Sequence, residues 1–228
     1  MTKIEITREA FTILRIPADL ARYVREAYDY IDQNRELKCT ARLWKGPYKT
    51  FLEELMPFSR FCTWKYGVRD DVLCALVHGT PGRDAIVIER KMGSEHSVEI
   101  TYPIDGQQLL EEGRQLNERG ITDVKTWLGN DISRQQSAID LTLRIANKKT
   151  LRDYRSPGGS SLIFVFNHML FWDSNPKHVE LLAFLRTQLS LLDFQADDVL
   201  LMFIGDQKRI LEVKRTIYPL ESDAVKRT

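Results

Sequence analysis

Two acidic residues in this sequence stand where a pair of strands could bring them to one metal ion. Asp84 begins an apolar segment of about residues 84–90, just after Pro81-Gly82, and Glu99 lies within a second one of about residues 97–102. Both segments have the length and composition of β-strands. A metal-dependent phosphodiesterase needs two carboxylates within reach of one divalent cation, so the pair indicates Mg²⁺ or Mn²⁺ chemistry. The structural alternative is that Asp84 caps a turn and Glu99 is an exposed strand acid.

The connection between the two segments decides whether these acids meet. A two-residue turn at Gly93-Ser94 pairs Ile88 with Glu99 and leaves Asp84 about 13 Å away along its strand. A four-residue connection at residues 90–93, with Gly93 at positive φ, pairs Asp84 with Glu99 directly. Both registers put the acids on one face of the sheet, but only the second makes a site. We therefore predict the second register, with the two carboxylates close enough to share one cation.

Alternation along the second segment separates an apolar face from a polar one. Val98, Ile100 and Tyr102 are expected to enter the core, while Glu99 and Thr101 point to the other side of the sheet. A one-residue slip would exchange the two faces, so burial of the apolar set should hold the register.

The order of these segments resembles that of the PD-(D/E)XK nuclease-like superfamily, in particular its divergent bacterial members. The matching motifs are Asp84-Ala85, the sequence VEIT at residues 98–101 and Asp105-Gly106. FLEELMPFSRF at residues 51–61 is similar to the family's first core helix, and KKTLRDYR, before SSLIFVF, is similar to the lysine-containing helix that precedes its fourth core strand. The resemblance covers about residues 48–168. It implies a restriction-endonuclease-like core that hydrolyses DNA or RNA phosphodiester bonds with Mg²⁺ or Mn²⁺.

The resemblance also implies roles for individual residues. Asp84 and Glu99 would bind the metal, and Glu54 or Glu53 of the first core helix would assist. Adjacent helical residues point about 100° apart, so one of these two should reach the site, and we favour Glu54. The family's lysine, two positions after the strand glutamate, is Thr101 here, which would orient water or a ligand.

The missing lysine leaves two hypotheses for the function. Lys148 or Lys149 could supply the positive charge from the preceding helix, and we assign the catalytic role to Lys148. Alternatively, the chain is a catalytically degenerate member of the family that serves as a nucleic-acid-binding or protein-interaction module. Thr101 favours this second hypothesis, because it stands where the family has its lysine. A fold by itself does not confer an activity.

Basic residues follow one face of the helix expected at residues 132–154. They recur at steps of four, four and three, with Lys149 adjacent, and are Arg144, Lys148, Arg152 and Arg155. Such a stripe can bind a phosphate backbone. The alternative is an ordinary solvated helix face.

Composition limits the classes of protein that this sequence can represent. The chain has 228 residues, of which 43% are apolar, and a net charge of +1, so a nucleic-acid partner would be bound by a local patch. Three cysteines and four histidines show no metal-ligand spacing, and two of the cysteines are expected to be core residues in a reducing compartment. Without a signal peptide or a membrane-spanning segment, the protein is expected to be cytoplasmic and to have no membrane partner.

The pattern of helices and strands predicts one α/β domain over residues 1–228, with a central mixed β-sheet flanked by helices. An N-terminal helical extension is expected at about residues 1–45 and the core at about residues 46–217. Predicted helices cover residues 17–35, 48–67 with a break near Pro57, 107–120, 132–154 and 176–192. Besides the two acidic segments, strands are predicted at residues 72–77, 162–166, 199–204 and 209–217, with a short one within residues 1–16.

Overall fold

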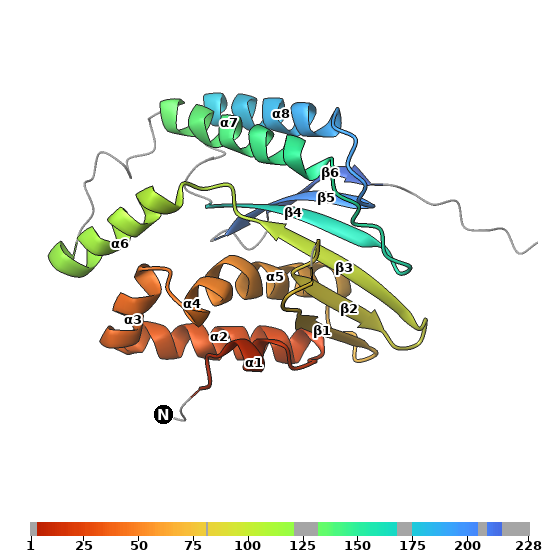
Figure 1. Ribbon diagram of the computed structural model, residues 1–228, viewed down its shortest axis with the longest axis horizontal. Coiled ribbons are helices and arrows are strands. Elements are labelled where there is room, and N and C mark those ends of the chain that lie inside the picture. Colours follow the sequence, from red (N-terminus) through yellow and green to blue (C-terminus); the bar gives the residue numbers. More distant parts are fainter. Residues whose placement is uncertain (1–3, 81, 121–131, 168–174, 205–208, 216–228) are drawn as a thin grey trace, which may run out of the picture.

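A mixed β-sheet forms the centre of the molecule, with helices on both of its faces (Figure 1). The computed structural model describes residues 4–80, 82–120, 132–167, 175–204 and 209–215. In this part of the chain the sheet has six strands, which lie side by side in the order in which they occur in the sequence. They are β1 (Val72–Leu76), β2 (Ala85–Glu89), β3 (Ser94–Thr101), β4 (Ser160–Asn167), β5 (Asp198–Ile204) and β6 (Ile210–Arg215). The expected class, a central mixed sheet flanked by helices, is confirmed.

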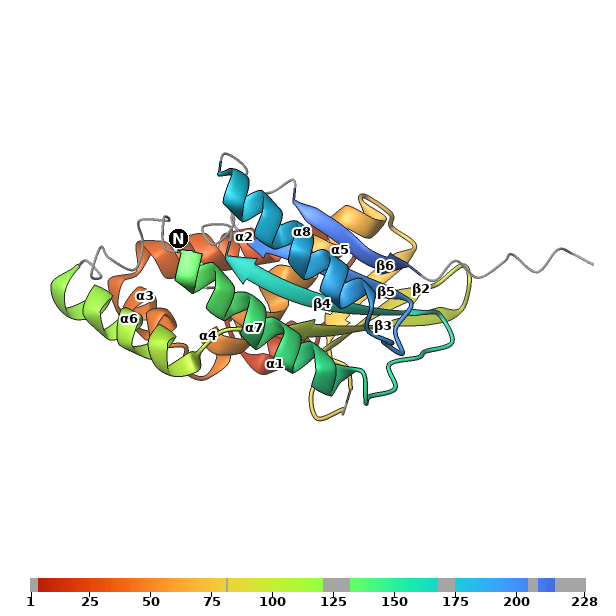
Figure 2. The ribbon, with the colours of Figure 1, turned by 90° about the horizontal axis from the view of Figure 1, so that it is seen from above.

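The direction of the strands explains where the helices lie. β1, β2 and β3 are antiparallel neighbours, whereas β3, β4 and β5 run parallel and β6 turns back against β5. Parallel neighbours need crossover connections. Here α6 (Gly106–Arg119) and α7 (Ile132–Lys149) lie between β3 and β4 in the chain, and α8 (Pro176–Ser190) lies between β4 and β5. Both α7 and α8 cover one face of the sheet, as Figures 1 and 2 show.

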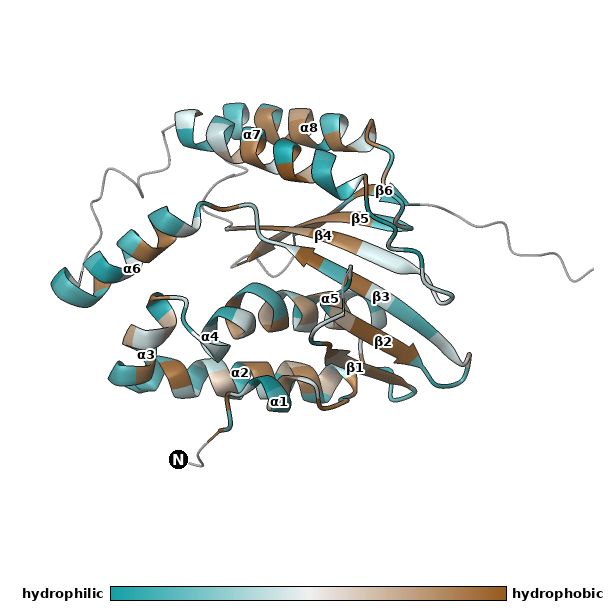
Figure 3. Ribbon diagram, viewed as in Figure 1, coloured by the Kyte–Doolittle hydropathy of each residue, from teal (hydrophilic) through white to brown (hydrophobic). Residues whose placement is uncertain are grey.

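The opposite face of the sheet is covered by the helices that precede β1 in the chain. They are α1 (Arg8–Phe11), α2 (Pro17–Gln33), α3 (Arg35–Arg42), α4 (Pro47–Thr50), the π-helical turn η1 (Phe51–Leu55) and α5 (Met56–Tyr66). Each strand alternates between the two layers, so Val98 and Ile100 belong to the core under α5 while Leu162 and Phe164 belong to the core under α7 and α8. Brown stripes along the strands in Figure 3 follow these apolar residues. The expected burial of Val98, Ile100 and Tyr102 is confirmed, with Tyr102 partly buried against the same core.

The predicted break near Pro57 takes the form of a π-helical turn. α4, η1 and α5 follow one another without a loop, and Pro57 is at the start of α5, where its missing N–H costs little. A single π turn often marks a functional position in a helix. It carries Glu53 and Glu54.

Two predicted elements differ from the observed ones. Residues 1–16 were expected to contain a strand, but residues 8–11 form helix α1, because the Thr7 hydroxyl caps it by accepting the Ala10 N–H at 3.2 Å. The helix predicted at residues 132–154 ends at Lys149. After this residue, the N–H of Tyr154 donates to the carbonyl of Gln195, so the chain pairs with the segment before β5 and cannot continue as a helix.

Among the described helices, none combines the length with the apolar character that crossing a bilayer requires. The predicted connection around residues 205–206 and the irregular segment at residues 121–131 lie outside the described residues.

A close approach between α6 and α3 makes one glycine necessary. A Cβ atom at Gly113 would lie 2.1 Å from the carbonyl oxygen of Arg42, whereas one at Gly106 would have nothing within 4 Å. We predict that Gly113→Ala lowers the free energy of unfolding by about 1–3 kcal/mol, because the two helices must separate. Gly106→Ala, in the first turn of the same helix, should be neutral or slightly stabilising. Urea unfolding of both variants tests this, and equal stability would contradict the packing.

A buried histidine joins β3 to β4. His96 is 4% exposed; its Nε2 lies 2.9 Å from Ser161 Oγ and its Nδ1 lies 3.2 Å from the Gly158 carbonyl oxygen. Since a carbonyl only accepts, Nδ1 donates and Nε2 accepts from the serine. Burial, followed by the charge of Lys65, lowers the pKa of His96 to about 4. The folded protein therefore holds this imidazole neutral.

We predict that His96 makes the fold sensitive to acid. The unfolded imidazole takes up a proton near its ordinary pKa of about 6.5, so the stability present above that pH should fall as pH decreases towards about 4. The loss should reach about 3 kcal/mol. Unfolding measured across this range should show a smaller pH dependence in His96→Gln, and an unchanged one in the exposed control His78→Gln. The same dependence in all three proteins would refute the role of His96.

Candidate functional site

Asp84 directly precedes β2 and lies close enough to Glu99 of β3 for that charge to raise its pKa. The antiparallel ladder of β2 and β3 pairs Ile88 with Glu95 and ends with Ala85 opposite Val98. The N–H of Asp84 donates to the carbonyl of Val98 at 2.9 Å, and Asp84 Oδ2 accepts the Ile100 N–H at 2.7 Å. The predicted register is confirmed.

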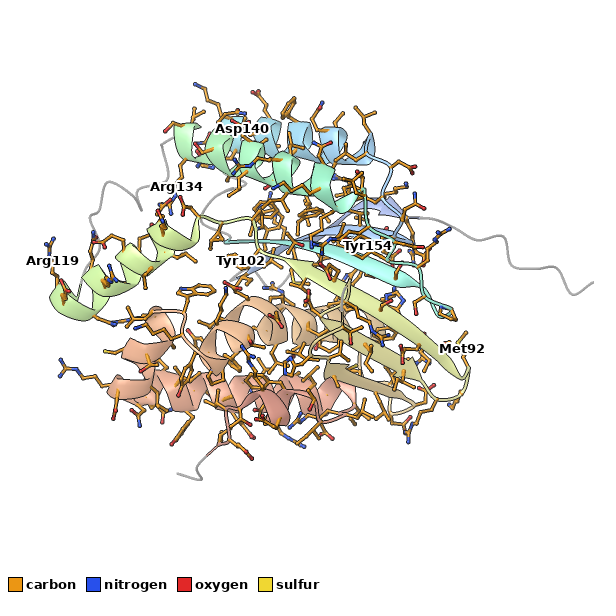
Figure 4. All side chains as sticks on the ribbon, viewed as in Figure 1. Met92, Tyr102, Arg119, Arg134, Asp140 and Tyr154 are labelled. Carbon is orange, nitrogen blue, oxygen red and sulfur yellow. The ribbon has the colours of Figure 1, made fainter. Side chains whose placement is uncertain are left out.

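The connection between the strands has the predicted length. Four residues, 90–93, separate β2 from β3, and Gly93 has a φ of 62°, which is favourable for glycine. The N–H of Met92 donates to the Glu89 carbonyl at 3.1 Å, and the Met92 side chain projects from the tip (Figure 4). The alternative two-residue turn is not formed.

Two cations neutralise Glu99, whose side chain is 7% exposed. Lys149 Nζ forms an ion pair with Glu99 Oε1, and Arg152 Nη1 lies 3.6 Å from the same oxygen. Lys149 is the last residue of α7, and its side chain is 14% exposed. Lys148, to which the sequence argument gave the catalytic role, is exposed. The structure brings Lys149 to the site instead, because successive residues of a helix point about 100° apart.

The surroundings of Asp84 disfavour the charged form of its carboxyl group. Its pKa is raised to about 6, first by burial and then by the negative charge of Glu99. The Ile100 N–H, Lys149 and Arg152 act in the opposite direction. The acid therefore changes its charge close to neutral pH, as residues of functional sites often do.

Of the two acids on η1, Glu54 is the one that interacts with Asp84. Burial first, and then the charges of Asp84 and Glu53, raise the pKa of Glu54 to about 7. Glu53 lies 3.8 Å from Lys49, and burial raises its pKa also. The preference for Glu54 agrees with this arrangement.

A cleft of about 470 Å³ adjoins the acids. Glu54 and Asp84 line it together with Arg8, His78 and Arg83. The sequence argument did not find these three residues. Arg83 precedes Asp84 in the chain and could have been considered, but no local signal points to Arg8 or His78, because tertiary packing alone brings α1 to the β1–β2 connection.

Two hydroxyl-bearing residues complete the surroundings of Glu99. Thr101 is on the same strand face, and its Oγ1 is buried with no hydrogen-bond partner among the described residues. Tyr154, which the sequence argument missed, lies between the end of α7 and β4 (Figure 4). Burial raises the pKa of Tyr154, and the charge of Glu99 adds to this effect while Arg152 opposes it.

The four basic residues do not form the single helical stripe that their spacing suggested. Arg144 and Lys148 are exposed on α7, but Arg152 and Arg155 follow its end at Lys149. Arg152 approaches Glu99, and Arg155 pairs with Asp153 at 2.7 Å. The continuous stripe is therefore wrong, since helical spacing stops where the helix does.

The donor atoms of this site suit a hard cation. Within the described ranges, no group of three or more His, Cys, Asp or Glu side chains is arranged to hold a metal ion. Mg²⁺, however, is commonly held by one or two carboxylates, with water and substrate phosphate completing its shell. Asp84 and Glu99 are two carboxylates that lie near each other.

Comparison of the chain with protein-family models, with curated proteins and with solved structures gives no match in any of the three.

We predict that the ion pair of Lys149 with Glu99 stabilises the fold. Lys149→Met leaves a buried carboxylate with only Arg152 nearby, so the free energy of unfolding at pH 7.5 should fall by about 2 kcal/mol or more. Lys148→Met changes an adjacent but exposed lysine and should cost little. Chemical unfolding of both variants at pH 7.5 checks this, and equal losses in the two variants would contradict it.

Proposed function

We propose that this protein is a metal-dependent nuclease that hydrolyses phosphodiester bonds of nucleic acid on a restriction-endonuclease-like core. The observation that carries the proposal is the proximity of Asp84 to Glu99, with Lys149 paired with Glu99. The element order supports it: a helix with Glu54 precedes three antiparallel strands, a helical crossover and a parallel fourth strand. This order is similar to that of the PD-(D/E)XK superfamily.

Each residue of the site has a chemical role in this proposal. Asp84 and Glu99 would hold Mg²⁺ or Mn²⁺, and a cation bound there would polarise the phosphoryl group and activate water. Lys149 supplies the positive charge that the family takes from a strand lysine, and it stabilises the charge that develops on the phosphate. Glu54, with a pKa of about 7, can accept a proton on its carboxylate from the attacking water near neutral pH. Thr101 offers a hydroxyl that orients a ligand.

A second function is favoured by the neutralisation of Glu99. Lys149 and Arg152 already contact its Oε1, so a cation would have to compete with them for this oxygen. A protein that keeps the fold but binds no metal would be a nucleic-acid-binding or protein-interaction module. The same experiment separates the two functions.

We predict metal-dependent cleavage that requires Asp84. Labelled DNA and RNA oligonucleotides are incubated with the protein and with Mg²⁺ or Mn²⁺, and Asp84→Asn should lower the rate at least about a hundredfold. The matched control is Asp140→Asn, which changes an exposed acid on the outer side of α7 (Figure 4) and should retain the rate.

Calorimetric titration of Mg²⁺ provides a second readout of the same prediction. Affinity should increase between pH 5.5 and pH 8, because Asp84 and Glu54, with pKa values of about 6 and about 7, must lose their protons to bind a cation. If the wild type neither binds the metal nor cleaves either nucleic acid, the enzyme proposal fails and the binding module remains.

A further inference from the structure

Two arginines line the cleft beside the acids, and neither has a role in the catalysis proposed above. Arg8 lines the cleft, and the structure shows no ion pair for its guanidinium within the described part of the chain. Arg8 is close enough to Glu54 for its charge to lower the pKa of that acid. Arg83 also lines the cleft, but its Nη1 is paired with Glu95. Of the two described arginines that line the cleft, Arg8 is therefore the one without an ion pair.

The fold holds Arg8 in place at the cleft. Phe11 of the same short helix is fully buried, and its ring lies 6.2 Å from that of Phe51 in η1, the turn that carries Glu54. His78 Nε2 donates to the carbonyl oxygen of Arg8 at 3.2 Å, which ties the β1–β2 connection to α1. Arg15 and Cys74 exchange backbone hydrogen bonds of 3.0 and 2.7 Å. Thus α1 is fixed to both elements that form the cleft before any ligand binds.

The size and chemistry of the cleft limit what it can accept. A volume of about 470 Å³ is that of a small-molecule pocket, which accommodates one or two nucleotides but not a double helix. Arginine binds phosphate through a planar array of donors. Arginine and histidine also stack on unpaired bases, and threonine hydroxyls such as that of Thr80 can donate to phosphate oxygens.

The acidic pair lies between two sets of cations. Asp84 interacts with Glu99, which Lys149 and Arg152 contact, and it also interacts with Glu54, which is within the range of Arg8. Lys149 and Arg152 are already paired with Glu99, so Arg8 is the partner that this arrangement offers to a phosphate next to the acids.

We propose that this cleft binds a single-stranded segment of nucleic acid, with Arg8 contacting a phosphate next to the acidic pair and His78 stacking on the adjoining base. The choice of a nucleic acid as ligand depends on the proposed function. The strandedness and the role of Arg8 come from the cleft itself.

Binding without cleavage tests the proposal. Fluorescence anisotropy in EDTA measures the Kd of a labelled single-stranded oligonucleotide and of a duplex of the same length. Arg8→Gln should raise the Kd for the single strand about tenfold and reduce the salt dependence by about 0.7 of a slope unit. Arg25→Gln, which changes an exposed arginine of α2, is the matched control and should change neither value. Arg8→Lys should recover part of the affinity.

The outcomes separate this inference from the nuclease proposal. Equal binding by Arg8→Gln and Arg25→Gln, or a duplex bound as tightly as the single strand, overturns the inference even if the wild type cleaves. If Arg8→Gln alone raises the Kd for the single strand and the wild type cleaves neither nucleic acid, the inference is supported and the nuclease proposal is refuted. Absence of any binding by the wild type overturns the inference as well. Thermal unfolding of each variant verifies that the exposed substitution leaves the fold intact.

Discussion

The burial of the Glu99 carboxylate on β3, with the partly buried Asp84 nearby, is the constraint on which this structure depends. Like charges that lie close together repel each other, and burial increases the cost of each. The ion pair of Lys149 with Glu99 and the Ile100 N–H that donates to Asp84 offset this cost. Both compensating groups need a precise position, one at the end of α7 and one on β3. The crossover from β3 to β4 must therefore place the end of α7 beside Glu99, so that Lys149 can pair with this acid.

The site draws on every layer of the fold. Asp84 and Glu99 come from the sheet, Glu54 from the π turn in the layer of α5, and Lys149 from the layer of α7. No single element would bring three acids and a lysine together. The raised pKa values of Asp84 and Glu54 are an electrostatic result of this convergence.

Residues 1–45 were expected to be a helical extension outside the core, but α1 from this segment contributes a residue to the cleft. The side chain of Phe11 anchors α1 on η1, and through this contact Arg8 reaches the cleft next to Asp84. The same layer buries Val98 and Ile100, whose position sets the register of β3. One packing interface therefore both fixes the register of β3 and supplies a cation beside the acids.

The sequence by itself determined the strands, their polar and apolar faces and the four-residue connection that sets the register of β2 and β3. These features follow from local rules: side chains alternate along a strand, and a glycine such as Gly93 permits the turn that sets the register. Only the tertiary structure decided the end of α7, the choice of Lys149 over Lys148 and the position of Arg8. The helix ends at Lys149 because Tyr154 pairs with Gln195, forty-one residues further along the chain, and helical spacing carries no information about such a distant partner.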